Sequence, residues 1–362
     1  MNQTELIYKQ TRGFSPFAYT MINEWLYFCD QHVPCLFRYN LEKKTCECVA
    51  EFRFQCMNKN IFKILAYKDE LWFLPFRGNN IVRFDLNKKI FLKDNILKKI
   101  RGEYIPFCDI FFEKENAFFI PFGGNPFLIK VDLTTYKRSE IDLVGDEYKS
   151  NNINFSGAVR LQNKIYILEC GRNFLIIYDV ESGGVETVNP KDYNLRDTFP
   201  VKAKENSIYF FPSNVNENVV IYDTENHNFS EKKFPINNFS SGEIYLVSAI
   251  NEEVWIFANK KARIYLLNQD FKIRKEIAVL NFNVTDKTIY VSGMEFEDRF
   301  FWHGHAGSPL IQVKNSNVEI VEVYEDKNII EIYFEVLHKC KNGAVVKKMG
   351  IGKQIHKKLI LQ

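Results

Sequence analysis

Short runs of aromatic and β-branched residues, each preceded by a polar turn, recur along the chain. The first run reads WLYF after Glu24, and the second reads LWFL after Glu70. Strands of four to eight residues explain such runs, whereas an amphipathic helix needs a longer segment with a period of 3.6 residues. Successive runs lie 43 to 47 residues apart, which indicates an internal repeat. The runs follow Glu24, Glu70, Asn116, Asn163, Asn206, Glu252, Asp298 and, more weakly, Asn342.

A second apolar run follows each of the first seven and ends on an Asp or Asn. Such a side chain accepts hydrogen bonds from nearby backbone N–H groups and starts a tight turn. We therefore interpret these residues as turn formers rather than as a catalytic set. In the seventh copy the residue, Asn315, is displaced by one position. The other six are Asn40, Asp85, Asp132, Asp179, Asp223 and Asn268.

Each repeat has room for four strands, and four antiparallel strands every 40 to 50 residues are typical of a propeller blade. The sequence predicts an all-β fold, an eight-bladed β-propeller in one domain over residues 1–362. Because the last repeat stops after three strands, we expect residues 5–10 to supply its fourth strand and to join the ends of the ring. The predicted repeats lie near 14–53, 61–98, 106–145, 155–190, 199–236, 244–281, 289–325 and 332–362.

The repeats resemble the β-propeller superfamily over essentially the whole chain, and the paired aromatic strands are similar to kelch-like or quinoprotein-like propellers. Kelch repeats carry a diglycine after their second strand, and here only Gly123-Gly124 stands in that position. The tryptophan docking motif of the quinoprotein type is missing. The resemblance thus implies the architecture, and no active site of either family transfers onto these residues.

Composition narrows the class of partner. The chain carries 48 Lys and Arg against 45 Asp and Glu, a net charge of +3. A nucleic-acid or membrane surface normally shows a segregated basic excess, so we expect neither partner. The longest apolar runs are too short for a membrane span, and the first residues, MNQTELIYKQTRG, hold no apolar core of a signal peptide.

Eight cysteines fall mostly inside predicted strands and show no paired CxxC spacing. Buried thiols in a reducing compartment are the simpler interpretation than a metal site or disulfides, so we expect a cytoplasmic protein. No nucleotide-binding fingerprint is followed by a helix, and the sequence identifies no cofactor.

The loops that join the second and third strands of each blade gather on one face of a propeller, around the central channel. Here these loops are rich in Gly, Asn and long polar side chains, a pattern that serves either as turns or as a set of donors for a polyhydroxylated or anionic ligand. The candidate ligand-binding residues on these loops and in the channel are Asp30, His32, Arg77, Asn79, Asp109, Asn125, Arg172, Asn173 and Trp302.

The pair His303 and His305 is the sharpest local feature, since the chain has only six His. Three interpretations stay open: a structural loop, a general acid and base with Glu169 nearby, or metal coordination if a third ligand such as His32, Asp109 or Glu169 came close. Nothing in the sequence places that third ligand, so we assign no metal.

Two functions follow from these observations. The first is a binding propeller that recognises a glycan, peptide or protein at the loop face, favoured because no motif has a fixed catalytic spacing. The alternative is a propeller enzyme, a hydrolase, lyase or epimerase acting on a carbohydrate or peptide. In that case His303, His305 and Glu169 would be the catalytic residues.

Overall fold

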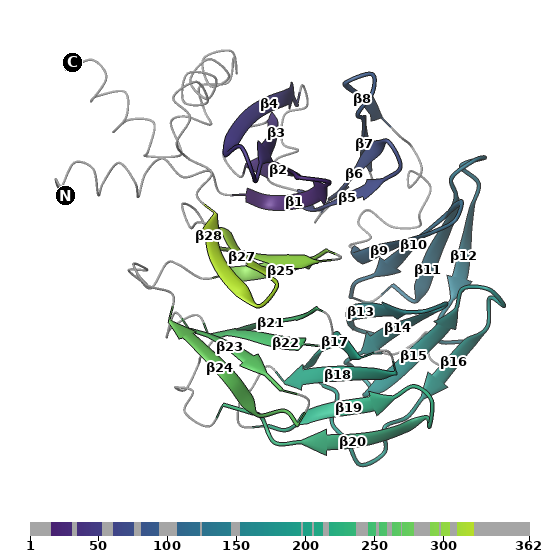
Figure 1. Cartoon of the computed structure of the whole chain (residues 1–362). Helices are drawn as coiled ribbons and strands as arrows, with labels where there is room; N and C mark the ends of the chain where they lie inside the picture. Colours follow the sequence, from purple (N-terminus) through teal and green to yellow (C-terminus); the bar gives the residue numbers. More distant parts are fainter. Residues whose placement is uncertain are drawn as a thin grey trace, which may run out of the picture.

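The structure is a computed structural model in which every regular element of the described residues is a β-strand. The strands form seven four-stranded antiparallel sheets, and within each sheet neighbouring strands follow one another along the chain. Figure 1 shows the sheets arranged as blades around a centre. The described residues are 16–30, 35–52, 61–75, 81–93, 107–123, 125–145, 153–196, 198–204, 206–212, 217–236, 245–250, 253–258, 263–268, 270–278, 290–296, 298–304 and 310–321.

Each blade is one continuous stretch of chain, numbered here from blade 1 to blade 7. Blades 1 to 4 consist of β1 (Pro16–Ile22), β2 (Trp25–Asp30), β3 (Cys35–Asn40), β4 (Thr45–Glu51); β5 (Ile61–Tyr67), β6 (Glu70–Pro75), β7 (Val82–Asp85), β8 (Ile90–Lys93); β9 (Phe107–Glu113), β10 (Asn116–Pro121), β11 (Phe127–Asp132), β12 (Arg138–Asp142); and β13 (Phe155–Leu161), β14 (Lys164–Glu169), β15 (Phe174–Asp179), β16 (Val185–Val188). Blades 5 to 7 consist of β17 (Thr198–Lys204), β18 (Ser207–Pro212), β19 (Val219–Asp223), β20 (Asn228–Lys232); β21 (Tyr245–Ile250), β22 (Glu253–Ala258), β23 (Arg263–Leu267), β24 (Ile273–Ala278); and β25 (Tyr290–Glu295), β26 (Arg299–Gly304), β27 (Leu310–Lys314), β28 (Asn317–Val321).

The second strand of each blade is buried on both of its faces. In β6, Leu71 and Phe73 pack toward blade 1, while Trp72 and Leu74 pack toward blade 3. Successive side chains of a strand point to opposite faces of the sheet, so a run such as ELWFLP supplies apolar surface to both neighbours. This arrangement explains why the repeated runs are nearly continuous in aromatic and aliphatic residues.

The Asp or Asn at the end of a third strand starts the tight turn into the fourth strand, as the sequence predicts. The side chain of Asp132 accepts hydrogen bonds from the backbone N–H groups of Thr134 at 2.9 Å and Thr135 at 2.7 Å. The same two bonds recur around Asn40 and Asp179, and around the corresponding aspartates of blades 2 and 5. These side chains therefore have a structural role, as the sequence indicates.

The prediction of eight blades is wrong, because seven sheets close the ring. Seven apolar clusters fill the seven boundaries between neighbouring blades, and one of them joins blade 7 to blade 1. In that last cluster Tyr19 and Phe28 of blade 1 pack against Phe301 and Leu310 of blade 7. The Tyr19 hydroxyl also donates a hydrogen bond to the Phe301 carbonyl oxygen at 2.8 Å. Blade 1 and blade 7 are direct neighbours, so no blade lies between them.

All four strands of blade 7 come from residues 290–321, so this sheet needs no strand from another part of the chain. The predicted closing strand at residues 5–10 and the predicted eighth repeat at 332–362 lie outside the described residues. The eight-repeat count failed because repeat-like sequence alone does not say which segments share an apolar boundary. The packing of Tyr19 against Phe301 shows that blades 1 and 7 share a boundary.

Candidate functional site

The antiparallel blades sort their connections to two ends of the molecule. The tight hairpins, from first to second strand and from third to fourth strand, lie at one end, which we call the hairpin end. The loops from second to third strand and the connections between blades lie at the other, which we call the mouth. The mouth is the face on which the sequence predicts ligand binding.

Several predicted site residues lie outside what the structure describes: His32, Arg77, Asn79 and His305. For two more only the backbone is described. Asp30 is the last residue of β2, and His303 lies in β26, opposite Ser292 of β25. Their assignment to a site stays a prediction.

Asp109 lies on β9, the innermost strand of blade 3, near the mouth. It forms an ion pair with Lys63 of β5 in blade 2, with Nζ and Oδ1 2.5 Å apart. The side chains are 24% and 18% exposed, so the pair is partly withdrawn from water. Because each charge has its partner, Asp109 links two blades across the channel wall.

Glu169 ends β14 and is 1% exposed. Its carboxylate accepts three backbone hydrogen bonds, from Asn154 at 2.8 Å and Gly171 at 3.0 Å on Oε1, and from Arg172 at 2.8 Å on Oε2. A buried carboxylate needs such partners, because an unpaired charge away from water is costly. The geometry therefore makes Glu169 the anchor of the blade 4 loop.

Asn173 and Asn125 shape their loops in the same way. Asn173 has a left-handed backbone with φ of 71°, donates to the Tyr193 carbonyl oxygen at 2.8 Å and accepts from the Leu195 N–H. It thus ties the blade 4 loop to the connection that leads into blade 5. Asn125 exchanges two hydrogen bonds of 3.3 Å with the backbone of Phe127.

Backbone hydrogen bonds join the mouth loops of blades 3 and 4. Gly123 and Phe155 exchange a pair of 3.2 Å bonds, and the Cys170 N–H donates to the Asn154 carbonyl oxygen at 2.9 Å. Gly123 has φ of 72°, a left-handed conformation that glycine adopts without steric cost. The loops of the two blades are therefore held in one arrangement, independent of any ligand.

Phe122 precedes this glycine and is 41% exposed, one of five large apolar side chains so exposed among the described residues. Asn125 and Arg172, on the joined loops, are half-buried, and Asn154 is exposed. We call Phe122, Asn125, Asn154 and Arg172 the mouth patch. The sequence analysis selected Asn125 from this loop and missed Phe122, although the aromatic residue directly before the diglycine was a usable signal.

Trp302 lies in the core. It is 0% exposed, packs against Phe257 and Phe300 between blades 6 and 7, and donates from Nε1 to the Ser248 hydroxyl at 3.0 Å. Its position gives it a packing role and keeps it away from a ligand in the mouth.

Among the described residues, no group of three His, Cys, Asp or Glu side chains is placed to hold a metal ion. The same part of the chain contains no helix that is both long enough and apolar enough to cross a lipid bilayer.

No protein-family model matches the sequence, and no curated protein is significantly similar to it. Solved structures match its fold. Virginiamycin B lyase from Staphylococcus aureus aligns with a TM-score of 0.60 and 14% identity, over 81% of this chain and 93% of the lyase. A catalytically inactive variant of that lyase with quinupristin gives 0.61 and 13%, over 82% and 94%.

Hsv2 from Kluyveromyces lactis gives a TM-score of 0.56 at 8% identity, over 85% of this chain and 98% of that protein. At such low identities these likenesses establish the propeller fold alone.

Proposed function

We propose that this protein is a binding propeller that recognises a glycan, peptide or protein at its mouth, with the mouth patch at the centre of the site. The observation that carries the proposal is an exposed aromatic ring, Phe122, on a backbone fixed by hydrogen bonds to the next blade. Fixed loops do not have to be ordered when the ligand binds, which favours affinity.

The chemistry of the mouth patch suits such ligands. An aromatic ring offers a flat apolar face to a sugar or an apolar side chain. Beside it, the Asn125 and Asn154 amides and the Arg172 guanidinium supply donors and acceptors for hydroxyl, carbonyl or carboxylate groups. Glu169, once a candidate acid or base, is occupied by three backbone donors, and this supports binding over catalysis.

A binding screen on immobilised glycans and peptides tests the proposal. We expect Phe122→Ala to weaken binding of a selected ligand about tenfold, because the variant loses the apolar contact of a buried ring face. Ile90→Ala is the matched control, since Ile90 is 47% exposed but lies at the hairpin end. Equal affinity of the wild type and Phe122→Ala for every ligand found would contradict the assignment.

The enzyme alternative depends on His303 and His305, and it stays a prediction, supported only by the close spacing of these two histidines in the sequence. An activity assay of the His303→Ala, His305→Ala double variant checks it. We also propose a cytoplasmic location, supported by the eight cysteines of the sequence, which suit a reducing compartment.

A further inference from the structure

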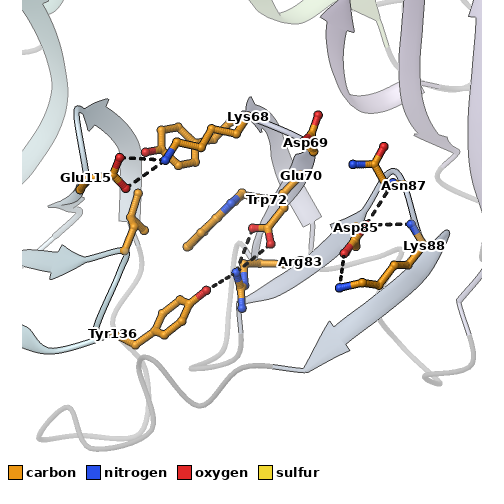
Figure 2. A pocket seen from close by; sticks show the side chains of 12 residues that line it. Lys68, Asp69, Glu70, Trp72, Arg83, Asp85, Asn87, Lys88, Glu115 and Tyr136 are labelled. Atoms are coloured by element: carbon orange, nitrogen blue, oxygen red, sulfur yellow. Dashed lines mark hydrogen bonds and ion pairs between the residues drawn. The ribbon is translucent and has the colours of Figure 1, made fainter.

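A cleft of about 330 Å³ opens at the hairpin end, between blades 2 and 3. It lies at the opposite end of the blades from the mouth patch. Four hairpin turns border it, two from each blade, and Figure 2 shows their side chains around the opening. Trp72 and Arg83 lie deepest, with 1% and 6% exposure. A space of this size holds one long side chain with its adjoining peptide groups.

A comparison with the boundary of blades 5 and 6 explains the opening. In both places a residue with positive φ in the turn of the third and fourth strands reaches toward the preceding blade: Phe271 in blade 6 and Tyr136 in blade 3. Phe271 is 6% exposed and stacks on Tyr209 of blade 5 at 5.3 Å between ring centroids. Tyr136 is 43% exposed, and the Arg83 guanidinium of blade 2 lies 4.8 Å from its ring centroid and donates to its hydroxyl at 2.7 Å. The aromatic side chain at this turn position therefore fills the boundary between blades 5 and 6, but it lies exposed at the rim of the boundary between blades 2 and 3.

The inner wall also differs between boundaries. Arg83 pairs in register with Trp72. The corresponding residue is aliphatic in blades 4, 5 and 6 (Ile177, Ile221 and Leu266), polar in blade 7 (Gln312) and cationic in blades 1 and 3 (Arg38 and Lys130). The Arg83 guanidinium lies 5.2 Å from the Trp72 ring and donates to both oxygens of Glu70 at 2.9 and 3.0 Å. The Arg83 guanidinium and the Glu70 carboxylate therefore give the cleft a polar floor.

Two groups in this cleft lack partners that a ligand would supply. The Trp72 indole N–H is buried and has no hydrogen-bond acceptor. Asp69, exposed at the rim, has no cationic partner within the described structure. The three cations of the lining are each paired with another carboxylate: Arg83 with Glu70, Lys68 with Glu115 and Lys88 with Asp85. The four carboxylates of the lining exceed its three cations by one charge. Trp255, at the position of Trp72 in blade 6, also lacks an acceptor. Each indole packs edge-on against a phenylalanine of the next blade, Phe300 for Trp255 and Phe112 for Trp72.

We propose that this cleft binds a basic peptide segment of a partner protein. An arginine or lysine side chain of the segment pairs with the Asp69 carboxylate at the rim of the cleft. A peptide carbonyl group of the same segment accepts the hydrogen bond from Trp72. Charge complementarity selects this partner, since Asp69 is the one lining carboxylate left without a cation.

Fluorescence anisotropy with labelled peptides tests the assignment. Three peptides share a Gly-Ser context and differ only in two central residues, which are Arg, Gln or Glu. We expect the Arg peptide to bind most tightly and the Glu peptide most weakly, with the preference reduced by added salt. Asp69→Asn should weaken binding of the Arg peptide about fivefold and leave the Gln peptide unchanged.

Trp72→Phe keeps an aromatic ring and removes the N–H group, so it should weaken binding of both the Arg and the Gln peptide about fivefold. Glu231→Gln in blade 5 removes an exposed carboxylate elsewhere and is the matched control. Phe122→Ala separates this site from the mouth and should have no effect here. Equal binding of the Arg and Gln peptides, or of the Arg peptide to the wild type and to Asp69→Asn, would overturn the proposal even if Trp72→Phe proved unstable.

Discussion

Aspartates that open the turns between third and fourth strands carry much of the local order at the hairpin end. The pKa values of Asp85, Asp132, Asp179 and Asp223 are all lowered, first because backbone N–H groups of the turn donate to each carboxylate. A carboxyl group with a lowered pKa in the folded state stabilises the fold above its ordinary pKa. That contribution is lost as the pH falls through the folded pKa.

Asp179→Asn should therefore make stability less dependent on pH on the acid side. Near neutral pH we expect little change, because an amide oxygen accepts the same two bonds, as Asn40 does in blade 1. Below about pH 4 the wild type should lose more thermal stability than the variant. Melting temperatures across this range, with Asp192→Asn as an exposed control outside these turns, would show the difference. Parallel pH profiles of wild type and Asp179→Asn would count against this view.

At the scale of a single blade, close packing between strands limits which residues are possible. Gly293 on β25 lies beside Trp302 on β26, and a Cβ atom at Gly293 would be 2.7 Å from Cδ1 of the indole. The ring is fully buried and held by its bond to Ser248, so it has little room to move.

Gly293→Ala should destabilise the protein by about 1–3 kcal/mol through this overlap. Gly184→Ala is the control, since its Cβ would meet only the Ser182 hydroxyl, at 3.3 Å, in an exposed turn, and we expect a change within about 0.5 kcal/mol. Urea unfolding of both variants measures the contrast. A stability of Gly293→Ala equal to that of Gly184→Ala would show that the indole moves freely.

The strands of each blade were predictable because their periodicity comes from burial on both faces, and the turns because Asp and Asn have a local hydrogen-bonding role. The sites were not. The run NIVRFD reads as an ordinary strand, and nothing local shows that Arg83 lies at the floor of a cleft. Glu169 was a candidate catalytic residue and Trp302 a candidate ligand contact, because sequence gives polarity and size but does not give the hydrogen-bond partners of these side chains.

The seven described blades form a ring, and the first and last blades meet through side-chain contacts. Tyr19 and Phe301 are 282 residues apart in sequence, and their hydrogen bond and ring contact belong to the boundary between the first and last blades. Burial raises the pKa of Tyr19 well above its ordinary value, so the hydroxyl stays protonated and donates throughout the physiological range.

Tyr19→Phe should lower the free energy of unfolding by about 1–2 kcal/mol, because the Phe301 carbonyl loses a buried donor. Local opening should increase at this boundary before any other. Hydrogen exchange checks this, with faster exchange expected in β1 and β26 than in β14 and β18. Tyr209→Phe, at the boundary of blades 5 and 6, is the control. A uniform rise in exchange over all blades would contradict the prediction.

Neighbouring blades elsewhere in the circle follow one another along the chain, whereas blades 1 and 7 share no strand within the described residues. A tensile load applied to residues 16 and 321 therefore acts on the side-chain contacts of this boundary, where the described strands of the two blades form no β-ladder with each other. The same feature makes each four-stranded unit modular. Because each described blade is one continuous stretch of chain, one blade could be removed or duplicated by editing a single segment of the sequence.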